Sequence, residues 1–485
     1  MNWLLIGNIV YILVVVLVSL RVIYDTRSTT KTLAYILLIL FLPVIGIFIY
    51  FSFGINYRKR KMYSKKLLKN EELELKVLER IREVSLKTFA EGNPAVQRYP
   101  RLFHYLLNEV NSPLTGYNSI QVLFNGEQKI PNVIEQLKKA EKFIHIEYYI
   151  YENDDTGNEI AEVLIEKAKQ GVEVRFIYDD FGSHSIRRKF IKRLRENDVK
   201  VSPFYKIAFI AFANRLNYRN HRKIIIIDGK TGFVGGINIS NKYCNYPQYN
   251  NKLYWRDTHL MISGPGVYNL QTIFIADWNF CAKDNLEANQ HFFPPISSIC
   301  QPDNKQLQIA SSGPDSDEPT ILYSQIQAIG SAKKELLITT PYFIPGEGMM
   351  DALIVAAYSG VRVRLLVPGI SDSFFVNTAS NSYYGDLLKA GVEIYRYQKG
   401  FVHAKTLVCD RSVSIVGTAN MDHRSFDLNF EVNAVVYDQE IALQLAQAFE
   451  NDLRNAERID PVQWENRPML TKIFEKTCRL VSPIL

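Results

Sequence analysis

The sequence of 485 residues lacks the patterns in which cysteine stabilises a fold or binds a metal. Its five cysteines form no CxxC pair and no Cys/His cluster at metal-ligand spacing (Cys244, Cys281, Cys300, Cys409 and Cys478). This argues against a disulfide framework and a structural zinc site, and it favours a reducing compartment. We accordingly expect no metal ion and no other cofactor.

A long basic stretch interleaved with aromatic residues, as proteins that bind single-stranded nucleic acids have, is also missing. The formal net charge is only +7 in a chain that is 22% charged and 47% hydrophobic. A nucleic-acid partner is therefore not expected. The length allows two or three domains with a large core, and nothing in the sequence indicates an oligomeric state.

Two long uncharged stretches, residues 3–20 and 32–57, are present near the N-terminus. Each exceeds the ~18 apolar residues that a bilayer-spanning helix needs. No basic segment precedes them, so a signal peptide fits poorly. A buried hairpin of a soluble protein is the alternative, but residues 14–18 and 37–42 are apolar on every face. We therefore predict a transmembrane hairpin in residues 1–60, with spans at about 3–23 and 33–54.

Basic residues follow the second stretch more densely than the first. The loop between the stretches carries three of them, and residues 58–66 carry six (Arg58, Lys59, Arg60, Lys61, Lys65 and Lys66). Because the larger cluster stays in the cytoplasm, we expect a multi-pass protein of the cell membrane whose body is cytoplasmic. The cluster either only sets this topology or also binds anionic lipid headgroups. Residues 61–110 are predicted to be a linker, with an amphipathic helix over about 64–91.

One motif occurs twice in the remainder of the chain. The pattern HxKxxxxD begins at His221 and again at His403, and each copy is followed by a Gly and an Asn at matching offsets. The two copies lie within segments 215–242 and 398–425. Three fixed letters of this kind should arise by chance at only a few in ~10⁵ positions. Two copies with the same tail therefore indicate an internal duplication.

Short β-branched runs alternate with helical segments in both halves, which is typical of βα units and an α/β fold. Residues 171–178 resemble 360–367, and residues 198–202 resemble 391–395. We predict lobe 1 at residues 111–300 and lobe 2 at residues 301–485, paired about a pseudo-two-fold axis over one cleft. Lobe 1 has an apolar, aromatic insertion at residues 205–215, either a buried connection or an acyl-chain contact.

The motif residues point to chemistry on a phosphodiester. If each motif is a strand, residues two apart face the same side, so His221 projects with Lys223 and His403 with Lys405. The aspartates that end the motifs, Asp228 and Asp410, would lie on the opposite side of the strand from the lysines. We expect them to be structural partners of backbone or Arg groups. Further groups are expected to bind the phosphate (Asn238 and Asn420) or to orient the imidazoles (Asp257 and Glu431).

Two imidazoles and two ammonium groups are suited to phosphoryl transfer without a metal. The lysines and asparagines would neutralise and hold the nonbridging oxygens. One imidazole would attack phosphorus and the other would protonate the leaving oxygen, so we expect the two to begin in opposite protonation states. The pairs at 154–155 and 179–180 could be metal ligands, but capping or strand-end roles are favoured.

The duplicated motif resembles that of the phospholipase D superfamily. Within that superfamily, longer strings resemble the bacterial cardiolipin synthases, namely residues 42–54, 146–150, 219–223, 312–316 and 420–431. The resemblance runs from the first uncharged stretch almost to the C-terminus. One departure is Gly236, where many members have Ser or Thr, which removes a hydroxyl contact in lobe 1 but no essential group.

This resemblance implies a two-lobed α/β/α sandwich with one active site and a metal-independent, two-step reaction. Two phosphatidylglycerol molecules would reversibly give cardiolipin and glycerol through a phosphohistidine, with His221 as nucleophile and His403 as general acid and base. Phosphatidylglycerol and anionic membrane lipids are the implied partners, and the inner membrane is the implied location. The alternatives are a membrane-anchored phospholipase D that uses water, a nuclease, or an inactive membrane scaffold.

Overall fold

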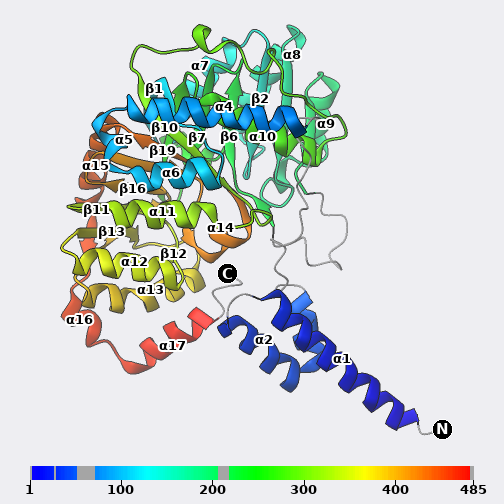
Figure 1. Ribbon diagram of the computed structural model, residues 1–485, viewed down its shortest axis with the longest axis vertical. Helices are drawn as coiled ribbons and strands as arrows, with labels where there is room; N and C mark the ends of the chain where they lie inside the picture. The colour runs from blue at the N-terminus through cyan, green and yellow to red at the C-terminus, as the bar shows by residue number, and fades with distance from the viewer. Residues whose placement is uncertain (1–2, 27–28, 52–70, 206–217, 481–485) are drawn as a thin grey trace.

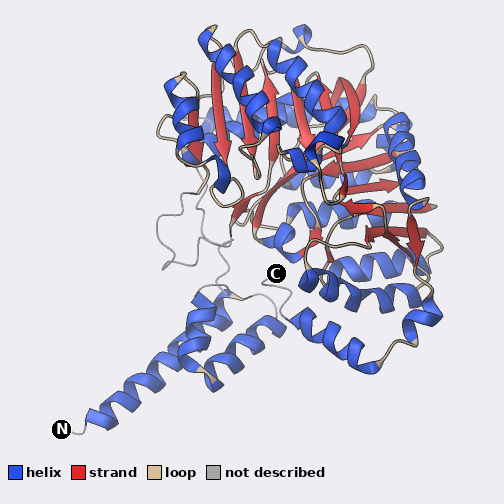
Figure 2. Ribbon diagram, turned by 180° about the vertical axis from the view of Figure 1, so that it is seen from behind, coloured by secondary structure: helices blue, strands red, loops and turns tan. Residues whose placement is uncertain are grey.

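The computed structural model describes residues 3–26, 29–51, 71–205 and 218–480. One mixed β-sheet runs through the body of the molecule, with helices packed on both of its faces (Figures 1 and 2). The α/β fold predicted from the sequence is thus confirmed.

The strand order of this sheet shows the duplication directly. From one edge to the centre, lobe 1 contributes β4 (Lys200–Pro203), β3 (Glu173–Tyr178), β2 (Phe143–Tyr148), β6 (Lys223–Ile227), β7 (Thr231–Gly235), β9 (Thr258–Ser263) and β1 (Thr115–Phe124). From the centre outward, lobe 2 contributes β10 (Lys305–Ser312), β19 (Asn429–Tyr437), β17 (Val413–Gly417), β16 (Thr406–Cys409), β11 (Glu335–Thr339), β13 (Arg362–Pro368), β14 (Glu393–Tyr397) and β20 (Ala456–Arg458). The second order mirrors the first, with β20 added at the outer edge. Antiparallel pairing of β1 with β10 joins the halves.

Three clusters of buried apolar residues fix the helices to the sheet. One face is covered in lobe 1 by α7 (Asn125–Lys138), α8 (Asp155–Lys169) and α9 (Lys189–Glu196). In lobe 2 it is covered by α6 (Pro100–Glu109), α11 (Thr320–Ser331), α12 (Glu347–Tyr358) and α13 (Phe374–Lys389). The opposite face carries α10 (Val267–Cys281) and α15 (Gln439–Leu453), whose shared core includes strand residues of both lobes.

The isoleucine run within the first motif shows how the sheet is buried on both faces. Ile224 and Ile226 belong to the core under α10, while Ile225 and Ile227 belong to the core under α7 to α9. Side chains alternate across a strand, so an uninterrupted apolar run is required wherever helices cover both faces.

Two very short parallel pairings connect the lobes in addition to the β1–β10 pairing. β5 (Arg219–Asn220) pairs with the start of β19, and β8 (Tyr254–Arg256) pairs with β15 (Gly400–Val402). A third short pairing joins β12 (Phe343–Ile344) to β18 (Met421–Asp422), which is followed by α14 (His423–Asp427). The first two pairings each link a segment just before one motif histidine to a segment of the other lobe.

The N-terminal region differs from the predicted hairpin of two spans. Among the described residues, one helix is long and apolar enough to cross a membrane, the segment Leu5–Asp25 of α1 (Trp3–Asp25). The second stretch is divided into α2 (Thr29–Phe41) and α3 (Pro43–Ile49). At about 1.5 Å per residue, α1 reaches ~34 Å but α2 only ~20 Å, against ~30 Å of hydrocarbon.

Pro43 explains the break in the second stretch. Proline has no N–H and its ring clashes with the preceding helical turn, so a helix ends before it. The chain then reverses, and a Cβ on Gly46 would lie 2.7 Å from the Cα of Ile39. Tyr50 packs against Tyr35 of α2, with ring centroids 5.6 Å apart. The predicted second span is therefore a short hairpin that turns back on itself.

A helix, α4 (Glu71–Ala90), is present within the range predicted as helical; it is followed by α5 (Pro94–Arg98) and lies across lobe 1 in Figure 1. The basic cluster at residues 58–66 and most of the insertion at 205–215 lie outside the described residues. The chain ends in α16 (Pro461–Glu465) and α17 (Met469–Leu480), and α17 packs against α13.

Candidate active site

The two short cross-lobe pairings determine which groups surround each motif histidine. In the first, Asn220 lies opposite Phe430, and the next residues along the two strands are His221 and Glu431. In the second, Val402 lies opposite Arg256, followed by His403 and Asp257. Backbone bonds of 2.9 Å (His221 N to Phe430 O) and 2.7 Å (His403 N to Arg256 O) extend both pairings. Each imidazole is thereby placed beside a carboxylate of the opposite lobe.

The carboxylate of Glu431 holds His221. His221 Nδ1 lies 2.9 Å from each oxygen of this carboxylate, and both residues are buried. Glu431 also accepts hydrogen bonds from Thr418 Oγ1 at 2.5 Å and Asn429 Nδ2 at 3.1 Å. A carboxylate at Nδ1 fixes the tautomer and leaves Nε2 for the reacting atom.

The carboxylate of Asp257 holds His403 in the same way. His403 Nδ1 lies 2.6 Å from Asp257 Oδ2, while Asp257 Oδ1 accepts from the backbone N–H of Thr258 at 2.7 Å. The sequence predicted both carboxylates as orienting groups. It did not predict that each would serve the other lobe's imidazole.

The motif lysines lie in the same buried cluster. Lys223 Nζ donates to the carbonyl of His221 at 2.7 Å, and Lys405 Nζ donates to the carbonyl of His403. Burial lowers the pKa of Lys223 to about 7 and that of Lys405 to about 8. The motif strands begin at Lys223 and Thr406, so the histidines precede them and the strand parity expected for His221 and His403 does not apply.

Burial favours the neutral form of both imidazoles. Burial lowers the pKa of His221 to about 4 and that of His403 to about 3, and the carboxylate neighbours offset this only in part. The charge of Lys405 contributes to the shift in the pKa of His221, and Lys223 contributes to that of His403. The four groups therefore form one electrostatic cluster. Desolvation disfavours charge on both rings in the absence of substrate, and the opposite protonation states expected during the reaction stay a prediction.

The motif aspartates are structural, as the sequence predicted. Asp228 accepts three backbone N–H bonds of 2.8–2.9 Å from residues 141–143. Asp410 accepts three of 2.7–3.0 Å from residues 333–335, and a fourth from Tyr99. Both adopt positive φ, near 50°, in the turn that ends the motif strand. They anchor the far end of each motif strand to the neighbouring strand.

Asn238 and Asn420 are both buried in the loops that follow the second motif strands. Asn238 donates to Tyr243 Oη at 2.6 Å and accepts from the backbone N–H of Ile150. Asn420 donates to Asp422 Oδ2 at 3.1 Å, and its own Oδ1 has no hydrogen-bond partner in the described part of the chain. The amide of Asn238 is thus already engaged on both sides, whereas that of Asn420 retains a free acceptor.

Gly236 is required by the close approach of the carboxylate of Asp257. A Cβ at this position would lie 2.2 Å from Asp257 Oδ1. At the matching position of lobe 2, Thr418 fits and donates to Glu431. The absence of a hydroxyl in lobe 1, noted from the sequence, thus follows from the shorter carboxylate that stands there.

Aromatic rings around the histidines were not assigned roles from the sequence. The Tyr149 ring lies 4.8 Å from that of His221, and Trp255 lies 5.3 Å from His403. Tyr243 lies 5.8 Å from His403 on another side. Tyr149 belongs to residues 146–150, one of the strings that resemble the cardiolipin synthases, which was the available signal. Trp255 belongs to β8, whose three residues show no periodicity.

The remaining acidic pairs cap or stabilise turns, as favoured from the sequence. Asp154 caps the N-terminus of α8, and Asp179 accepts backbone N–H bonds from Phe181, Gly182 and Asn220. Among the described residues, no group of three His, Cys, Asp or Glu side chains is arranged to hold a metal ion.

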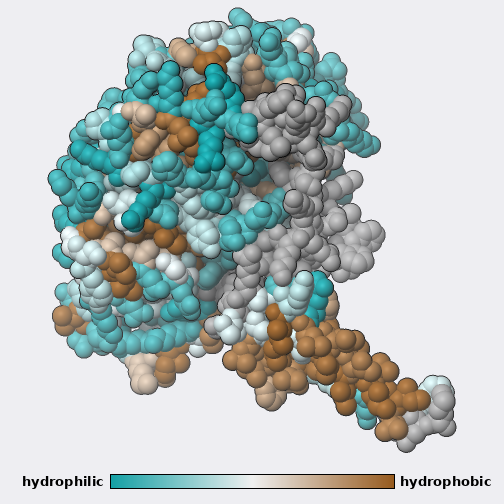
Figure 3. Space-filling view, viewed as in Figure 1, coloured by the Kyte–Doolittle hydropathy of each residue, from teal (hydrophilic) through white to brown (hydrophobic). Residues whose placement is uncertain are grey.

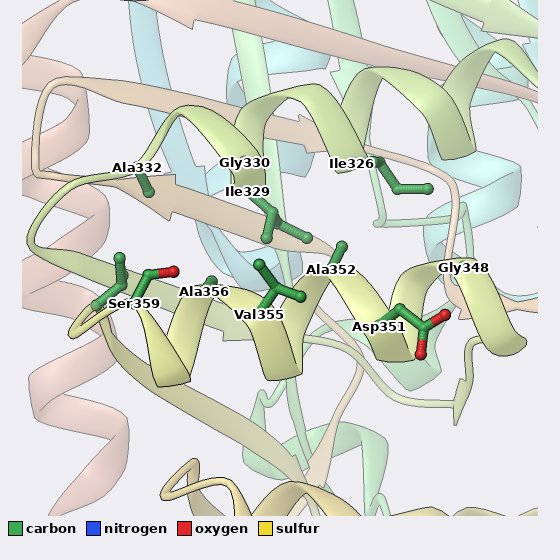
Figure 4. A pocket seen from close by; sticks show the side chains of 11 residues that line it. Ile326, Ile329, Gly330, Ala332, Gly348, Asp351, Ala352, Val355, Ala356 and Ser359 are labelled. Atoms are coloured by element: carbon green, nitrogen blue, oxygen red, sulfur yellow. The ribbon is translucent and has the colours of Figure 1, made fainter.

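A surface groove of about 370 Å³ between α11 and α12 lies apart from the histidine cluster (Figure 4). Its lining is mostly small and apolar, with Asp351 at one end and no motif residue. We assign it no part in the chemistry.

Two similar α/β halves that bring two His-x-Lys motifs into one buried cluster define a phospholipase D-like protein. The fold is supported by the crystal structure of a phosphatidylserine synthase from Haemophilus influenzae Rd KW20, with a TM-score of 0.59 and 14% sequence identity. The match covers 79% of this chain and 100% of that one.

Sequence comparisons identify the family more closely. The family model described as cardiolipin synthase, PLD-like domain, matches residues 133–278 and 325–453, and a phospholipase D-nuclease N-terminal model matches residues 9–54. The major cardiolipin synthase ClsA of Bacillus subtilis (strain 168) is 39% identical over 99% of this chain and 98% of its own length. A cardiolipin synthase of Alkalihalophilus pseudofirmus is also 39% identical, over 99% and 93%. The chain therefore belongs to the cardiolipin synthase family.

Proposed function

We propose that the protein is a phosphatidyltransferase that converts two phosphatidylglycerol molecules into cardiolipin and glycerol. The observation that carries the proposal is the reciprocal pairing of His221 with Glu431 and of His403 with Asp257 across the lobes. It presents two imidazoles, each with a fixed tautomer, in one buried cluster with two lysines. Family membership at 39% identity over nearly the whole chain supports the same reaction.

In the first step, His221 Nε2 attacks phosphorus of one lipid and the bond from phosphorus to the glycerol oxygen breaks. His403 supplies the proton with which glycerol leaves. In the second step, a primary hydroxyl of another phosphatidylglycerol attacks phosphorus, its proton passes to His403, and the bond from phosphorus to His221 breaks. Lys223 and Lys405 stabilise charge on the nonbridging oxygens.

His403 must first acquire the proton that it donates. It is neutral at pH 7 because burial lowers its pKa to about 3. A bound phosphodiester adds one negative charge beside both imidazoles, which raises the pKa of each. We propose that substrate binding thereby brings a proton into the cluster and that this proton resides on His403. Assignment of His221 as the nucleophile follows the superfamily resemblance.

The buried, aromatic surroundings of both histidines favour a lipid hydroxyl over water as the acceptor. The competing function is a hydrolase. Purified protein in phosphatidylglycerol vesicles with a labelled headgroup distinguishes them. We expect cardiolipin and free glycerol in equal amounts. Phosphatidic acid without cardiolipin would establish a phospholipase D instead. His221→Ala and His403→Ala should each abolish product while the chain stays folded.

Chelation provides a separate test of the mechanism. Because Lys223 and Lys405 supply the positive charge that a metal supplies elsewhere, we expect EDTA to leave the transfer rate unchanged. A loss of activity with EDTA that one divalent ion restores would contradict the proposed role of the lysines. Activity should be followed in the vesicle assay described above, with ionic strength held constant.

For the membrane arrangement we propose that the body, divided as predicted into residues 111–300 and 301–485, faces the cytoplasm. The six basic residues at 58–66, which span the junction of the anchor (1–60) and the linker (61–110), support this side. The predicted multi-pass topology requires a second crossing by α2 and α3, which form a short hairpin. If α1 is the single span, an N-terminal tag is protected from protease added to the cytoplasmic face. Cleavage of the tag on that face would show a cytoplasmic N-terminus, as the two-span topology requires.

A further inference from the structure

α17 carries an exposed apolar stripe, and no other described part of the chain covers it. Met469, Leu470, Ile473 and Phe474 recur at helical spacing and all are exposed, with Leu470 at 81%. The opposite side of the helix is buried against α13 through Glu475 and Cys478. An amphipathic helix normally turns its apolar face toward the core, and α17 also presents one outward.

Part of α13 extends the same surface. Phe374 and Phe375 at the start of α13 are exposed, Phe374 at 67%, and the ring of Phe374 lies 6.3 Å from that of Phe474. We call the surface formed by Phe374, Phe375, Met469, Leu470, Ile473 and Phe474 the α13/α17 face. Its aromatic and aliphatic residues are of the types that enter the boundary between headgroups and acyl chains.

Basic side chains border the α13/α17 face. α17 contains Lys472, Lys476 and Arg479 against the single acidic residue Glu475, which is neutralised by Arg467 through bonds of 2.7 and 3.0 Å. Apolar residues flanked by lysines are complementary to an anionic bilayer, where the lysines meet headgroups.

The face lies on the same side of the body as the apolar N-terminal helices. Figures 1 and 2 both place α17 beside α2, and Figure 3 shows hydrophobic residues on α1 to α3 and at the adjoining edge of the body. A bilayer that contains α1 therefore extends toward α17. This continuity favours lipid over a protein partner as the occupant.

The α13/α17 face is connected to the histidine cluster by a short series of contacts. Asp372, two residues before Phe374, accepts bonds of 3.0 and 2.8 Å from Tyr342 Oη. The Tyr342 ring lies 6.2 Å from that of Phe401, which lies 5.8 Å from His403. In lobe 1 the strand that corresponds to β13 is β3. The loop after β3 also exposes an aromatic residue, Phe181.

From these observations we infer that the α13/α17 face inserts into the surface of an anionic bilayer and holds the mouth of the histidine cluster against the lipid. Lipid substrates then reach the cluster along the Phe374 side without crossing water. The inference concerns how the body sits on the membrane, so it stands whether or not the proposed reaction is correct.

The test uses the full-length chain in nanodiscs of phosphatidylglycerol and phosphatidylethanolamine that contain doxyl-labelled acyl chains. Single cysteines that carry an environment-sensitive fluorophore replace Phe474 or Phe374 in a Cys300→Ser background, because Cys300 is the exposed native cysteine among the described residues. Leu443→Cys on α15, also exposed, is the matched control on another side of the body. We expect strong doxyl quenching at positions 374 and 474 and little at 443.

Two results would overturn the inference. One is quenching at 474 that does not exceed quenching at 443. The other is protection of 374 and 474 from both doxyl lipids and aqueous iodide, which would show that protein, such as a second copy of the chain, covers the face. As a functional readout, Leu470→Ser with Phe474→Ser should raise the apparent KM for bilayer substrate several-fold. The same variant should leave the rate on micellar short-chain phosphatidylglycerol unchanged.

Discussion

The carboxylate beside each imidazole differs by one methylene between the lobes, and the residue behind it differs accordingly. Glu431 reaches His221 with Thr418 behind it, while the shorter Asp257 reaches His403 with Gly236 behind it. The two pairs place a carboxylate at Nδ1 by different means. This suggests that Gly236 and Asp257 function as one unit, and Thr418 and Glu431 as another.

We expect Gly236→Thr to lower the rate of phosphatidyl transfer by about tenfold to a hundredfold, the range typical of a displaced orienting group. The added Cβ would lie 2.2 Å from Asp257 Oδ1 and would push the carboxylate away from His403. Combining Gly236→Thr with Asp257→Glu recreates the lobe 2 arrangement and should recover most of the loss. Rates are measured in phosphatidylglycerol vesicles at equal protein stability.

Thr418→Gly is the matched control for that pair. It removes the 2.5 Å hydrogen bond to Glu431 but displaces nothing, so we expect a smaller loss than for Gly236→Thr. Near-normal activity of Gly236→Thr alone, with the chain folded, would show that Asp257 does not need the space at Gly236.

The pKa values of Lys223 and Lys405, about 7 and 8, make phosphate binding depend on pH. A bound phosphodiester anion raises the pKa of both lysines, so the complex holds more protons than the free protein between about pH 7 and 9. Affinity must therefore fall as pH rises through that window, by up to about tenfold per pH unit for each lysine. Dimethyl phosphate is the suitable probe because it remains a monoanion throughout.

Titration calorimetry of dimethyl phosphate in two buffers of different ionisation enthalpy gives both affinity and proton uptake. Lys405→Met should weaken binding and remove the higher-pH part of the dependence. Constant affinity from pH 6.5 to 9 would contradict the lowered lysine pKa values and the proton uptake proposed for the reaction.

At the level of secondary structure, the motif aspartates secure the ends of β6 and β16. We expect Asp228→Ala to lower the free energy of unfolding by about 3 kcal/mol, because three backbone N–H groups lose their acceptor. Asp228→Asn keeps one acceptor and tolerates positive φ, so it should cost less. Chemical denaturation measures both, with exposed Lys230→Ala as the control. Activity per folded molecule should change little in either variant.

The elements show what local sequence can and cannot predict. The buried strand at Ile224–Ile227 and the turn at Asp228 can be derived from apolar patterning and turn chemistry alone, and the structure contains both. Pro43 was the available signal that the second apolar stretch is not one helix, and hydropathy alone hid it. β5, β8 and β15 have only two or three residues, too few to show any periodicity, yet they determine the neighbours of both histidines.

For the whole molecule, the duplication was predictable because each repeat has its own motif and strand pattern. The mirrored strand order about the β1–β10 pairing confirms it. The exchange of carboxylates between lobes was not predictable. It depends on the register between segments that are far apart in sequence. His221 and Glu431 are separated by 210 residues, and the histidine and carboxylate of the other pair by 146. A single sequence contains no direct signal for such a register.

The same cross-lobe connections predict that one chain contains one complete site. His221 N bonds to Phe430 O and His403 N bonds to Arg256 O within one chain, so lobes of two chains cannot exchange without breaking both pairings. We therefore expect full-length His221→Ala and His403→Ala chains, mixed in one membrane, to remain inactive. A mixture of unmodified chain with His221→Ala should give activity in proportion to the unmodified chain alone. Recovery of activity in the mixture of the two variants would show a site shared between chains and would contradict this prediction.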